Sequence, residues 1–449
     1  MTQDDGVATR QAALAALLQI DDQQAWASPV VDRVLSGSGL DDRDRAYVAN
    51  LVFSTLRWEG TLDWMLAHLV TRGLDAVQQE LLHILRLGTW ELRFGAAPAH
   101  AGVNTWVEVA RHAVGDRATG FVNGVLRNVV RRGDTLPWPD PTSVEGVALA
   151  TAHPPWVVEL ARERFGVDRA TDVLAAGNET APLILRAVAP REEVVARLAA
   201  DGVAASAGSL TDTAVVLGER VPPGRLAVIS EGLAIVQDQS SQVVGATAAR
   251  EIPAGATAVD LCAAPGGKTT HLAQAGLAVT AVDRHAGRLR RTAELAARLG
   301  LSITTRLADG AASGLPEASA DLVLVDAPCS GLGVVRRRPE LRWRKDPADV
   351  TALRAVQERL LRAAVLLTKP GGRIVYSVCT WTVAETDQVV AAVVEDGTAV
   401  LERAGQTAPN PDASGSLTEY GRQLAPDTEQ GDGMYLAVLR RPAEPGAVA

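Results

Sequence analysis

The second half of the chain alternates strand-like and helical segments, and this order constrains the fold more than any other feature. Between about Glu231 and Arg441, short apolar runs of strand length are separated by longer stretches with helical spacing. The strand-like runs are ATAVDLCA, AVTAVDR, ITTRLAD, DLVLVDAP, GGRIVYSVC and, near the end, MYLAVLRR. This alternation predicts a doubly wound α/β domain of the Rossmann-like kind, with a mostly parallel sheet.

The chain before this region divides into two further parts. Up to about Arg132, apolar residues recur at three- and four-residue spacing, which predicts an all-α bundle. The proline-rich segment GDTLPWPDPTS breaks the pattern and predicts a linker. Between Val144 and Ser230, one helical stretch (PPWVVELARERF) is mixed with the strand-like runs PLILRAV, TAVVLG and LAVIS, which predicts a small α/β element. We expect domains at residues 1–140, 141–230 and 231–441, followed by a disordered tail at 442–449.

Composition excludes several classes of protein. A chain of 449 residues is too long for one core. No stretch approaches the roughly 18 uncharged apolar residues of a membrane-spanning helix. The acidic N-terminus MTQDDGVATR lacks a signal-peptide core, so we expect the chain to be in the cytosol, where three separated cysteines stay reduced. We also expect a monomer. The seven scattered histidines predict no metal site. The net charge of −9 argues against a nucleic-acid partner, although charge distribution can override the total.

The turn after the first strand-like run of the α/β domain is a candidate cofactor loop. Asp260 ends the run, and in the following CAAPGGKTT Gly266 and Gly267 let the backbone approach a ligand closely. Two common phosphate-binding patterns fail, because Cys262 stands where GxxxxGK(S/T) needs glycine and GxGxxG is absent. The candidate cofactor-binding residues of this loop are Cys262, Ala263, Ala264, Pro265, Gly266, Gly267 and Lys268.

Acidic residues follow the next two strand-like runs. Asp283 lies 23 positions after Asp260, a spacing that suits a carboxylate bound to the two hydroxyls of a ribose. Asp309 follows the third run, where it could reach an adenine amino group. A nucleoside cofactor without a pyrophosphate fits these features better than NAD does, so S-adenosylmethionine is the candidate cofactor.

Two cysteines stand where strand-like runs give way to turns. Cys329 follows ADLVLVDAP, and Cys379 ends GGRIVYSVC. A thiol in such a place can face a cleft, and a helix N-terminus favours its thiolate form. A cofactor loop followed by two cleft-edge thiols indicates covalent chemistry. Cys262, inside the first turn, is more simply interpreted as a small buried hydrophobic residue.

Three motifs in this order, DLCAAPGGKTTHLA, VDAPCSGLGVVRRRPELRW and YSVCTW, resemble those of the RNA cytosine-5 methyltransferases. The segments VQDQSSQ and GDGMYLAVL are similar to the flanking motifs of that family. In the first part, DRDRAYVANLVFSTLRW and FVNGVLRN resemble the NusB-like RNA-binding domain of its RsmB branch. The resemblance covers nearly the whole chain. It implies a methyltransferase acting on 16S ribosomal RNA or on an assembly intermediate of the small subunit.

The resemblance also implies roles for three residues. Cys379 would be the nucleophile that adds to C6 of cytosine, because a thiolate both attacks and leaves readily. Cys329 would assist its release. Asp326 would face the N3/N4 edge of the cytosine as well as the cofactor, and so select against uracil. Three positions depart from the commoner pattern of the family and put rate or substrate fit in doubt: Val378, Thr386 (within Glu385–Asp387) and Met434.

A basic run directly after the DAPCSG loop is a candidate RNA-binding segment. Its basic residues are Arg336, Arg337, Arg338, Arg342, Arg344 and Lys345. A charge run is usually a solvated face, but this one adjoins the predicted site and contains Trp343, which favours contact with phosphates. The target cytosine must leave any base stack to be attacked, which implies base extrusion or an unpaired loop.

Two alternatives remain open from the sequence. One is a transfer RNA or DNA cytosine methyltransferase, although DNA enzymes of this chemistry generally attack from the Pro-Cys position. The other is a non-catalytic RNA-binding or assembly factor with a vestigial cofactor pocket. Lys268, Asp283, Asp326 and both thiols argue against the second. Which cytosine is modified is not encoded in any pattern of the chain.

Overall fold

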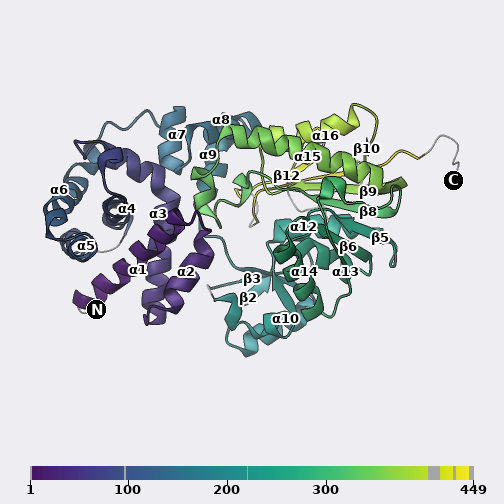
Figure 1. Cartoon of the computed structure of the whole chain (residues 1–449), viewed down its shortest axis with the longest axis horizontal. Helices are drawn as coiled ribbons and strands as arrows, with labels where there is room; N and C mark the ends of the chain where they lie inside the picture. Colours follow the sequence, from purple (N-terminus) through teal and green to yellow (C-terminus); the bar gives the residue numbers. More distant parts are fainter. Residues whose placement is uncertain (1–2, 96–97, 220, 403–414, 428–430, 444–449) are drawn as a thin grey trace. The chain divides into compact units, whose positions relative to one another are not determined.

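A computed structural model of the chain describes residues 3–95, 98–219, 221–402, 415–427 and 431–443 (Figure 1). The chain forms two compact units. The helical unit comprises Met1–Glu159 and Arg337–Arg344, and the sheet unit comprises Leu160–Arg336 and Lys345–Ala449. Most of the tail predicted to be disordered, residues 444–449, lies outside the described residues.

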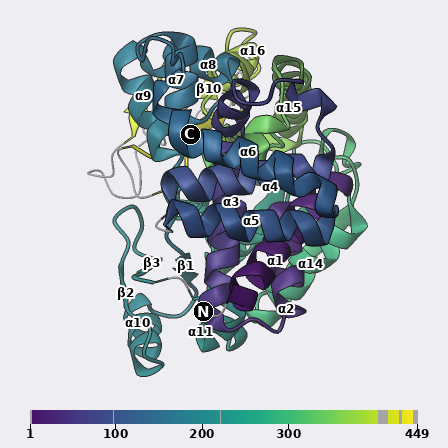
Figure 2. The same cartoon turned by 90° about the vertical axis from the view of Figure 1, so that its left-hand side faces the viewer.

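The helical unit confirms the prediction of an all-α bundle. Figure 2 looks onto α3 to α6, which pack side by side, with α1 packed against α3, α4 and α5. Its helices are α1 Gln3–Asp22, α2 Ala27–Ser36, α3 Asp42–Ala67, α4 Gln79–Phe94, α5 Ala99–Ala113, α6 Asp116–Arg132, α7 Val144–Thr151 and the start of α8 Pro155–Phe165, with 3-10 turns at Leu74–Ala76, Gly133–Thr135 and Pro339–Trp343. The last of these belongs to residues 337–344, which we call the inserted segment because they join this unit from far along the chain.

The bundle has one apolar core with a polar cluster inside it. Apolar side chains of α1 to α6 pack together in a single buried group. Glu91 lies within this group and pairs with Arg10. The indole of Trp106 donates to Glu91 at 2.6 Å and the hydroxyl of Tyr47 at 2.5 Å. Because each carboxylate oxygen of Glu91 accepts hydrogen bonds, burial of its charge costs little folding free energy. The same bonds fix α1, α3, α4 and α5 relative to one another.

The small α/β element is a four-stranded antiparallel sheet with the order β2-β3-β1-β4. The prediction of a strand at LAVIS is wrong, because Ala227–Ser230 forms the short helix α11. A four-residue apolar run does not distinguish a strand from one helical turn. Here the neighbour of β1 is instead the strand at Ala234–Val236. The elements are β1 Ile184–Ala187, α10 Arg191–Ala200, β2 Ala205–Ala207, β3 Ala214–Leu217, α11 Ala227–Ser230 and β4 Ala234–Val236.

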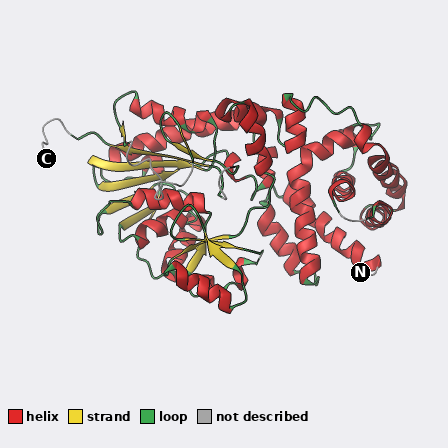
Figure 3. Cartoon of the chain, turned by 180° about the vertical axis from the view of Figure 1, so that it is seen from behind, coloured by secondary structure: helices red, strands yellow, loops and turns green. Residues whose placement is uncertain are grey.

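The large sheet confirms the predicted doubly wound domain. Its order is β11-β12-β13-β9-β8-β5-β6-β7, with β10 paired to β13. The pairs from β9 to β7 are parallel, whereas those of β13 and the pair β11–β12 are antiparallel, so the sheet is mixed and the prediction of a mostly parallel sheet is wrong. Figure 3 shows both sheets in yellow. The elements are α9 Val167–Ala176, α12 Gln239–Ala249, β5 Thr257–Asp260, α13 Gly267–Gln274, β6 Ala278–Asp283, α14 Ala286–Arg298, β7 Thr304–Leu307, β8 Ala320–Asp326, α15 Pro347–Leu367, β9 Thr368–Val378, α16 Asp387–Val394, β10 Val400–Leu401, β11 Ser416–Leu417, β12 Arg422–Leu424 and β13 Met434–Arg440.

Helices cover both faces of this sheet (Figure 1). Val323 and Val325 of β8 pack with α15 and α16, whereas Leu322 and Leu324 pack with α12 and α13. This alternation follows from the two-residue repeat of a strand, and it explains why β8 is apolar throughout. Of the helices in the described residues, none has the length and apolar character to cross a membrane.

Candidate active site

The carboxyl ends of β8 and β9 bring two thiols into contact. The strands run parallel with Asp326 opposite Ser377, so the chain leaves both at the same edge of the sheet. Cys329 lies just beyond β8, and Cys379 directly follows β9. Their sulfur atoms are 3.3 Å apart, and both residues are partly exposed. The fold therefore brings together two free cysteines that are 50 residues apart in the sequence.

The contact between the two sulfur atoms makes the Cys329 thiol harder to deprotonate. The hydrogen bond to Cys379 raises the pKa of the Cys329 thiol well above its ordinary value. Burial raises this pKa further, as do the charges of Cys379 and Glu385. Because a thiol that donates a hydrogen bond stabilises a neighbouring thiolate, the contact suits Cys379 as the nucleophile and Cys329 as the proton carrier.

Asp326, the last residue of β8, is fixed at the same edge. Its Oδ2 atom lies 2.8 Å from Nζ of Lys268, and its Oδ1 atom accepts a hydrogen bond from the Ser377 hydroxyl at 2.9 Å. The Asp326 side chain is 32 % exposed, whereas that of Lys268 is 9 % exposed. The carboxylate is therefore oriented by two partners and still accessible to a group that enters the site.

A second carboxylate, Glu385, lies beneath the thiols and is fully buried. It accepts hydrogen bonds from the Ser330 amide at 2.8 Å, the Gln357 side chain at 3.1 Å and the Thr382 hydroxyl at 2.8 Å. The sequence shows Glu385 only as the first residue of the triplet Glu385–Asp387. Its contact with Ser330 joins residues 55 positions apart, and no local pattern signals it.

The candidate cofactor loop is a tight turn that requires glycine. Gly266 has a φ of +106°, and a Cβ there would lie 3.0 Å from the Thr292 side chain. Helix α13 begins at the next residue. Behind the loop, Asp260 accepts a hydrogen bond from the Thr269 hydroxyl at 2.7 Å. Burial raises the pKa of Asp260 to about 7. Asp260 therefore braces the loop from the inside.

Asp283 is the last residue of β6 and Asp309 follows β7, at the same edge of the sheet as the loop. Asp283 accepts hydrogen bonds from the amides of Ala264, at 3.3 Å, and His285, at 2.8 Å, which fix it against the loop. Asp309 is exposed and accepts from the Ala311 amide at 2.9 Å. Both carboxylates are thus held in place by backbone donors.

The donor and acceptor groups of this region fit S-adenosylmethionine. Burial raises the pKa of the Cys262 thiol above its ordinary value, and four surrounding carboxylates raise it further: Asp260, Asp326, Asp283 and Asp309. The carboxylates around Cys262 thus supply negative charge and can accept hydrogen bonds. A sulfonium cation that carries ribose hydroxyls and amino groups matches them, since carboxylates accept hydrogen bonds from such groups and attract positive charge. In the described residues, no group of side chains is placed to hold a metal ion.

Arg186 of β1 reaches the back of the cofactor loop, a contact that the sequence analysis missed. Its guanidinium is fully buried and donates to Gln237 at 2.6 Å, to the Thr270 hydroxyl at 2.8 Å, to the Gly267 carbonyl and to Gln274. Burial lowers the pKa of Arg186 to about 10. An arginine inside the apolar run LILRAV was the available signal, because arginine is seldom buried without partners.

Replacing Arg186 with methionine should weaken cofactor binding. The substitution keeps much of the volume but leaves buried acceptors on the loop without donors, which loosens the start of α13. We expect S-adenosylhomocysteine to bind roughly tenfold more weakly in isothermal titration calorimetry, which corresponds to about 1.4 kcal/mol. The matched control is Arg197→Met, because Arg197 is a partly exposed residue whose ion pairs contribute little. Equal affinity of both variants and the wild type would contradict this role.

The basic residues predicted to bind RNA are largely engaged within the protein. Arg336 is buried and contacts Asp432 at 2.6 Å and Asp238 at 3.6 Å. Arg342 is fully buried and donates to the Ala152 carbonyl at 2.9 Å. A phosphate could reach either guanidinium only after these contacts break, so we assign no RNA contact to these two residues.

The other four basic residues keep some exposure. Arg344 is partly exposed and donates to carbonyls of α1 and the turn after it at 3.2 Å, and Arg338 is exposed and lies over the Trp26 ring. Lys345 lies 3.7 Å from Asp349. Arg337 is partly exposed. Contact of these four residues with RNA stays a prediction.

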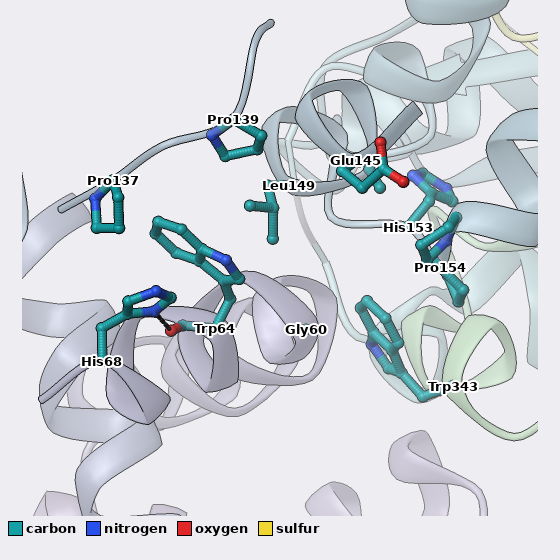
Figure 4. A pocket seen from close by; sticks show the side chains of 12 residues that line it. Gly60, Trp64, His68, Pro137, Pro139, Glu145, Leu149, His153, Pro154 and Trp343 are labelled. Atoms are coloured by element: carbon teal, nitrogen blue, oxygen red, sulfur yellow. Dashed lines mark hydrogen bonds between the residues drawn. The ribbon is translucent and has the colours of Figure 1, made fainter. Parts of the chain in front are cut away.

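The helical unit contains a pocket of about 360 Å³ whose walls are mostly apolar (Figure 4). Trp64 and Trp343 stand on opposite sides of it, with Gly60 between them. His68 hydrogen-bonds the Trp64 carbonyl at 2.8 Å. The remaining lining residues are Pro137, Pro139, Glu145, Ala148, Leu149, His153, Pro154 and Pro155. None of them belongs to the thiol or cofactor sites.

Replacing Gly60 with alanine should destabilise the helical unit. The indole of Trp343 packs directly on Gly60 and donates to the Leu56 carbonyl at 2.7 Å, so a Cβ at Gly60 would overlap the ring. We expect a loss of roughly 1–3 kcal/mol in the free energy of unfolding, measured by urea denaturation. Gly120→Ala in α6 is the matched control, because a Cβ there meets nothing and the change should be neutral or stabilising. Equal midpoints for both variants would contradict the packing argument.

The three departures from the commoner family pattern lie in the protein interior. Val378 and Met434 are buried in the two apolar groups that flank the large sheet. Thr386 is buried and its hydroxyl donates to the Thr382 carbonyl at 2.7 Å. These three side chains therefore affect the packing of the protein interior around them.

The sequence matches three known families along its length. Residues 251–440 match the family described as 16S rRNA methyltransferase RsmB/F. Residues 7–131 match the NusB family, and residues 153–223 match the ferredoxin-like domain of RsmF/B-like methyltransferases. The middle match agrees with the small antiparallel sheet.

Individual proteins match nearly the whole chain. Ribosomal RNA small subunit methyltransferase B of Xanthomonas campestris is 35 % identical over 448 residues, which cover 97 % of each chain. The protein of that name from Pseudomonas putida is 32 % identical over 89 % of this chain and 91 % of its own. The crystal structure of PH0851 matches with a TM-score of 0.81 at 21 % identity, over 97 % of this chain and 98 % of that one. At this identity the structural match establishes the fold alone.

Proposed function

The chain belongs to the 16S rRNA methyltransferase RsmB/F family, and on this premise we propose that it methylates C5 of a cytosine in 16S rRNA through a covalent bond from Cys379. It is an S-adenosylmethionine-dependent RNA methyltransferase. The observation that carries the finer proposal is the 3.3 Å contact between the Cys329 and Cys379 sulfur atoms at the sheet edge that also holds Asp326 and the cofactor loop. We further propose that it works in the cytosol.

The chemistry explains why two thiols are needed. C5 of cytosine is a weak nucleophile until the Cys379 thiolate adds to C6, which moves the electron pair of the C5–C6 double bond onto C5. When bound, S-adenosylmethionine would supply an electrophilic methyl group: the electron pair on C5 forms the new carbon–carbon bond, and the S–CH3 bond breaks with its electron pair on the sulfur of S-adenosylhomocysteine. A base then takes the C5 proton, the double bond re-forms, and the C6–sulfur bond breaks with the electron pair returning to Cys379.

Cys329 and Asp326 would assist these reaction steps in different ways. We propose that Cys329, whose sulfur lies 3.3 Å from that of Cys379, serves the release step, where proton transfer and expulsion of the thiolate must occur together. Asp326 is accessible and oriented by Lys268 and Ser377, so it would hydrogen-bond the amino edge of cytosine. Uracil presents a carbonyl there and would be rejected.

The remaining parts would hold the cofactor and the RNA. We propose that Asp283 binds the ribose hydroxyls, that Asp309 reaches the adenine, and that the loop Cys262–Lys268 surrounds the methionine part. We propose further that the helical domain at 1–140 and the element at 141–230 bind RNA, and that residues 231–441 carry the reaction.

One experiment tests this proposal. The purified chain is incubated with S-adenosylmethionine that carries a deuterated methyl group and with transcripts of 16S rRNA or transfer RNA, and the digested nucleosides are identified by mass spectrometry. We expect labelled 5-methylcytidine from 16S rRNA. Label in another nucleoside would refute cytosine C5 as the target, and label in transfer RNA alone would refute the substrate. Bisulfite sequencing of ribosomal RNA from a deletion strain would then locate the cytosine.

A further inference from the structure

The buried carboxylate of Glu385 lies at the point where the two cysteine-bearing loops meet. It accepts from the amide of Ser330, the residue after Cys329, at 2.8 Å. It also accepts from the hydroxyl of Thr382, on the loop that follows Cys379, at 2.8 Å. One side chain is therefore bonded to both loops within a few residues of each sulfur atom.

Neighbouring groups extend this connection. The Gln357 amide donates to Glu385 at 3.1 Å and to the Pro328 carbonyl at 2.8 Å, so helix α15 holds the same loop from a second direction. The hydroxyls of Ser330 and Thr380, the residues after the two cysteines, are 2.9 Å apart. The residues that directly follow Cys329 and Cys379 thus belong to one polar network.

We propose that Glu385 is a positioning residue that holds the Cys329 loop and the Cys379 loop in register, so that the two thiols stay in contact. The proposal deepens the proposed function and rests on it for the consequence in catalysis. The contact itself is a property of the folded chain without RNA or cofactor.

The energetics of Glu385 favour a functional role over a packing role. Within the described residues no cation lies within ion-pair distance of this fully buried carboxylate, and its three hydrogen-bond partners, Ser330, Gln357 and Thr382, are neutral donors. Burial of an unpaired carboxylate costs folding free energy even when it is hydrogen-bonded, and an apolar side chain would fill the same space at lower cost. The presence of a hydrogen-bond acceptor at this buried position is therefore explained by the two loops that it orients through Ser330 and Thr382.

Backbone hydrogen bonds alone do not fix the thiols. Ala327 donates to the Ser377 carbonyl at 2.9 Å and Gly333 donates to the Cys379 carbonyl at 3.0 Å. These bonds hold the Cys329 loop at its two ends. Glu385 contacts the stretch between them through the Ser330 amide, next to the reacting sulfur.

Dibromobimane provides a direct readout of the thiol contact, because it becomes fluorescent when it has alkylated two neighbouring thiols. The full-length wild type is compared with Glu385→Ala, Glu385→Gln and Glu395→Gln, the last being an exposed carboxylate just after α16. Peptide mapping identifies the bridged cysteines. Methyl transfer to 16S rRNA is measured on untreated portions of the same protein preparations.

We expect Glu385→Ala to slow bridging of Cys329 to Cys379 by roughly tenfold, and to lower kcat by about 10- to 100-fold with KM little changed, as displacement of a reacting group does. Glu385→Gln keeps the acceptor for Ser330 and should stay within roughly threefold of the wild type in both measurements. Glu395→Gln should match the wild type.

The proposal is overturned if Glu385→Ala bridges its thiols as fast as the wild type does. It is also overturned if a folded Glu385→Gln protein shows as large a loss in bridging rate and kcat as Glu385→Ala does. Should Glu385→Ala fail to fold, Thr382→Val provides the test, since it removes the hydroxyl that donates to Glu385 and keeps the volume of the side chain. Slower bridging by this variant would support the proposal, and unchanged bridging would overturn it. Because bridging needs neither RNA nor cofactor, failure to methylate cytosine would refute the proposed function and leave this result intact.

Discussion

The Cys379→Ala protein is expected to bind cofactor and RNA as the wild type does and to transfer no measurable methyl group. Cys379 is the residue that would form the bond to C6, and without it C5 stays too weak a nucleophile. We expect the rate of methyl transfer to fall by at least about a thousandfold, since loss of a covalent nucleophile removes the whole addition step. The measurement is single-turnover transfer of labelled methyl to 16S rRNA.

Calorimetric titration with S-adenosylhomocysteine and filter binding of RNA provide the controls for Cys379→Ala. Both affinities should stay close to those of the wild type, which separates lost chemistry from lost binding. Full methyl transfer by this variant would show that another group attacks the cytosine.

The Cys329→Ala protein should accumulate a covalent complex with RNA. Its Cys379 thiolate can still add to C6, but the thiol that stands 3.3 Å away and would serve release is gone. We expect a slowly migrating protein–RNA band on a denaturing gel, while turnover falls by roughly two to four orders of magnitude, the usual range for loss of a positioned proton-transfer group.

The double variant Cys329→Ala/Cys379→Ala is the matched control for this band. It should give none, since the bond that creates the complex comes from Cys379. A band that persists in the double variant would place the covalent bond on another residue, and turnover without a band in Cys329→Ala would contradict the release role.

Much of the sheet unit could be predicted because its strands are buried on both faces. Runs such as DLVLVDAP have the length and apolar character of a central strand, and β8 spans Ala320–Asp326 as expected. The misassigned LAVIS shows the limit, since four apolar residues fit one helical turn as well as a strand. The strand at Ala234–Val236 takes its place through pairing with β1, a long-range contact.

The candidate site could be predicted to the extent that it follows strand ends. Cys329, Cys379 and Asp326 come together because parallel strands present their carboxyl ends at one edge. Glu385 and Arg186 could not be found in this way, since their partners lie far along the chain. Nor does a run of arginines reveal which guanidiniums are turned inward, as Arg342 is.

Two sulfur atoms that touch in the resting protein are also a liability in air. Hydrogen peroxide would take two electrons from the pair and leave a cystine between Cys329 and Cys379, with water as the by-product. Formation of this disulfide would block both the attack on cytosine and the release of the product, and a dithiol reagent should reverse it. Preparations kept without reductant are therefore expected to lose activity in a single, recoverable step.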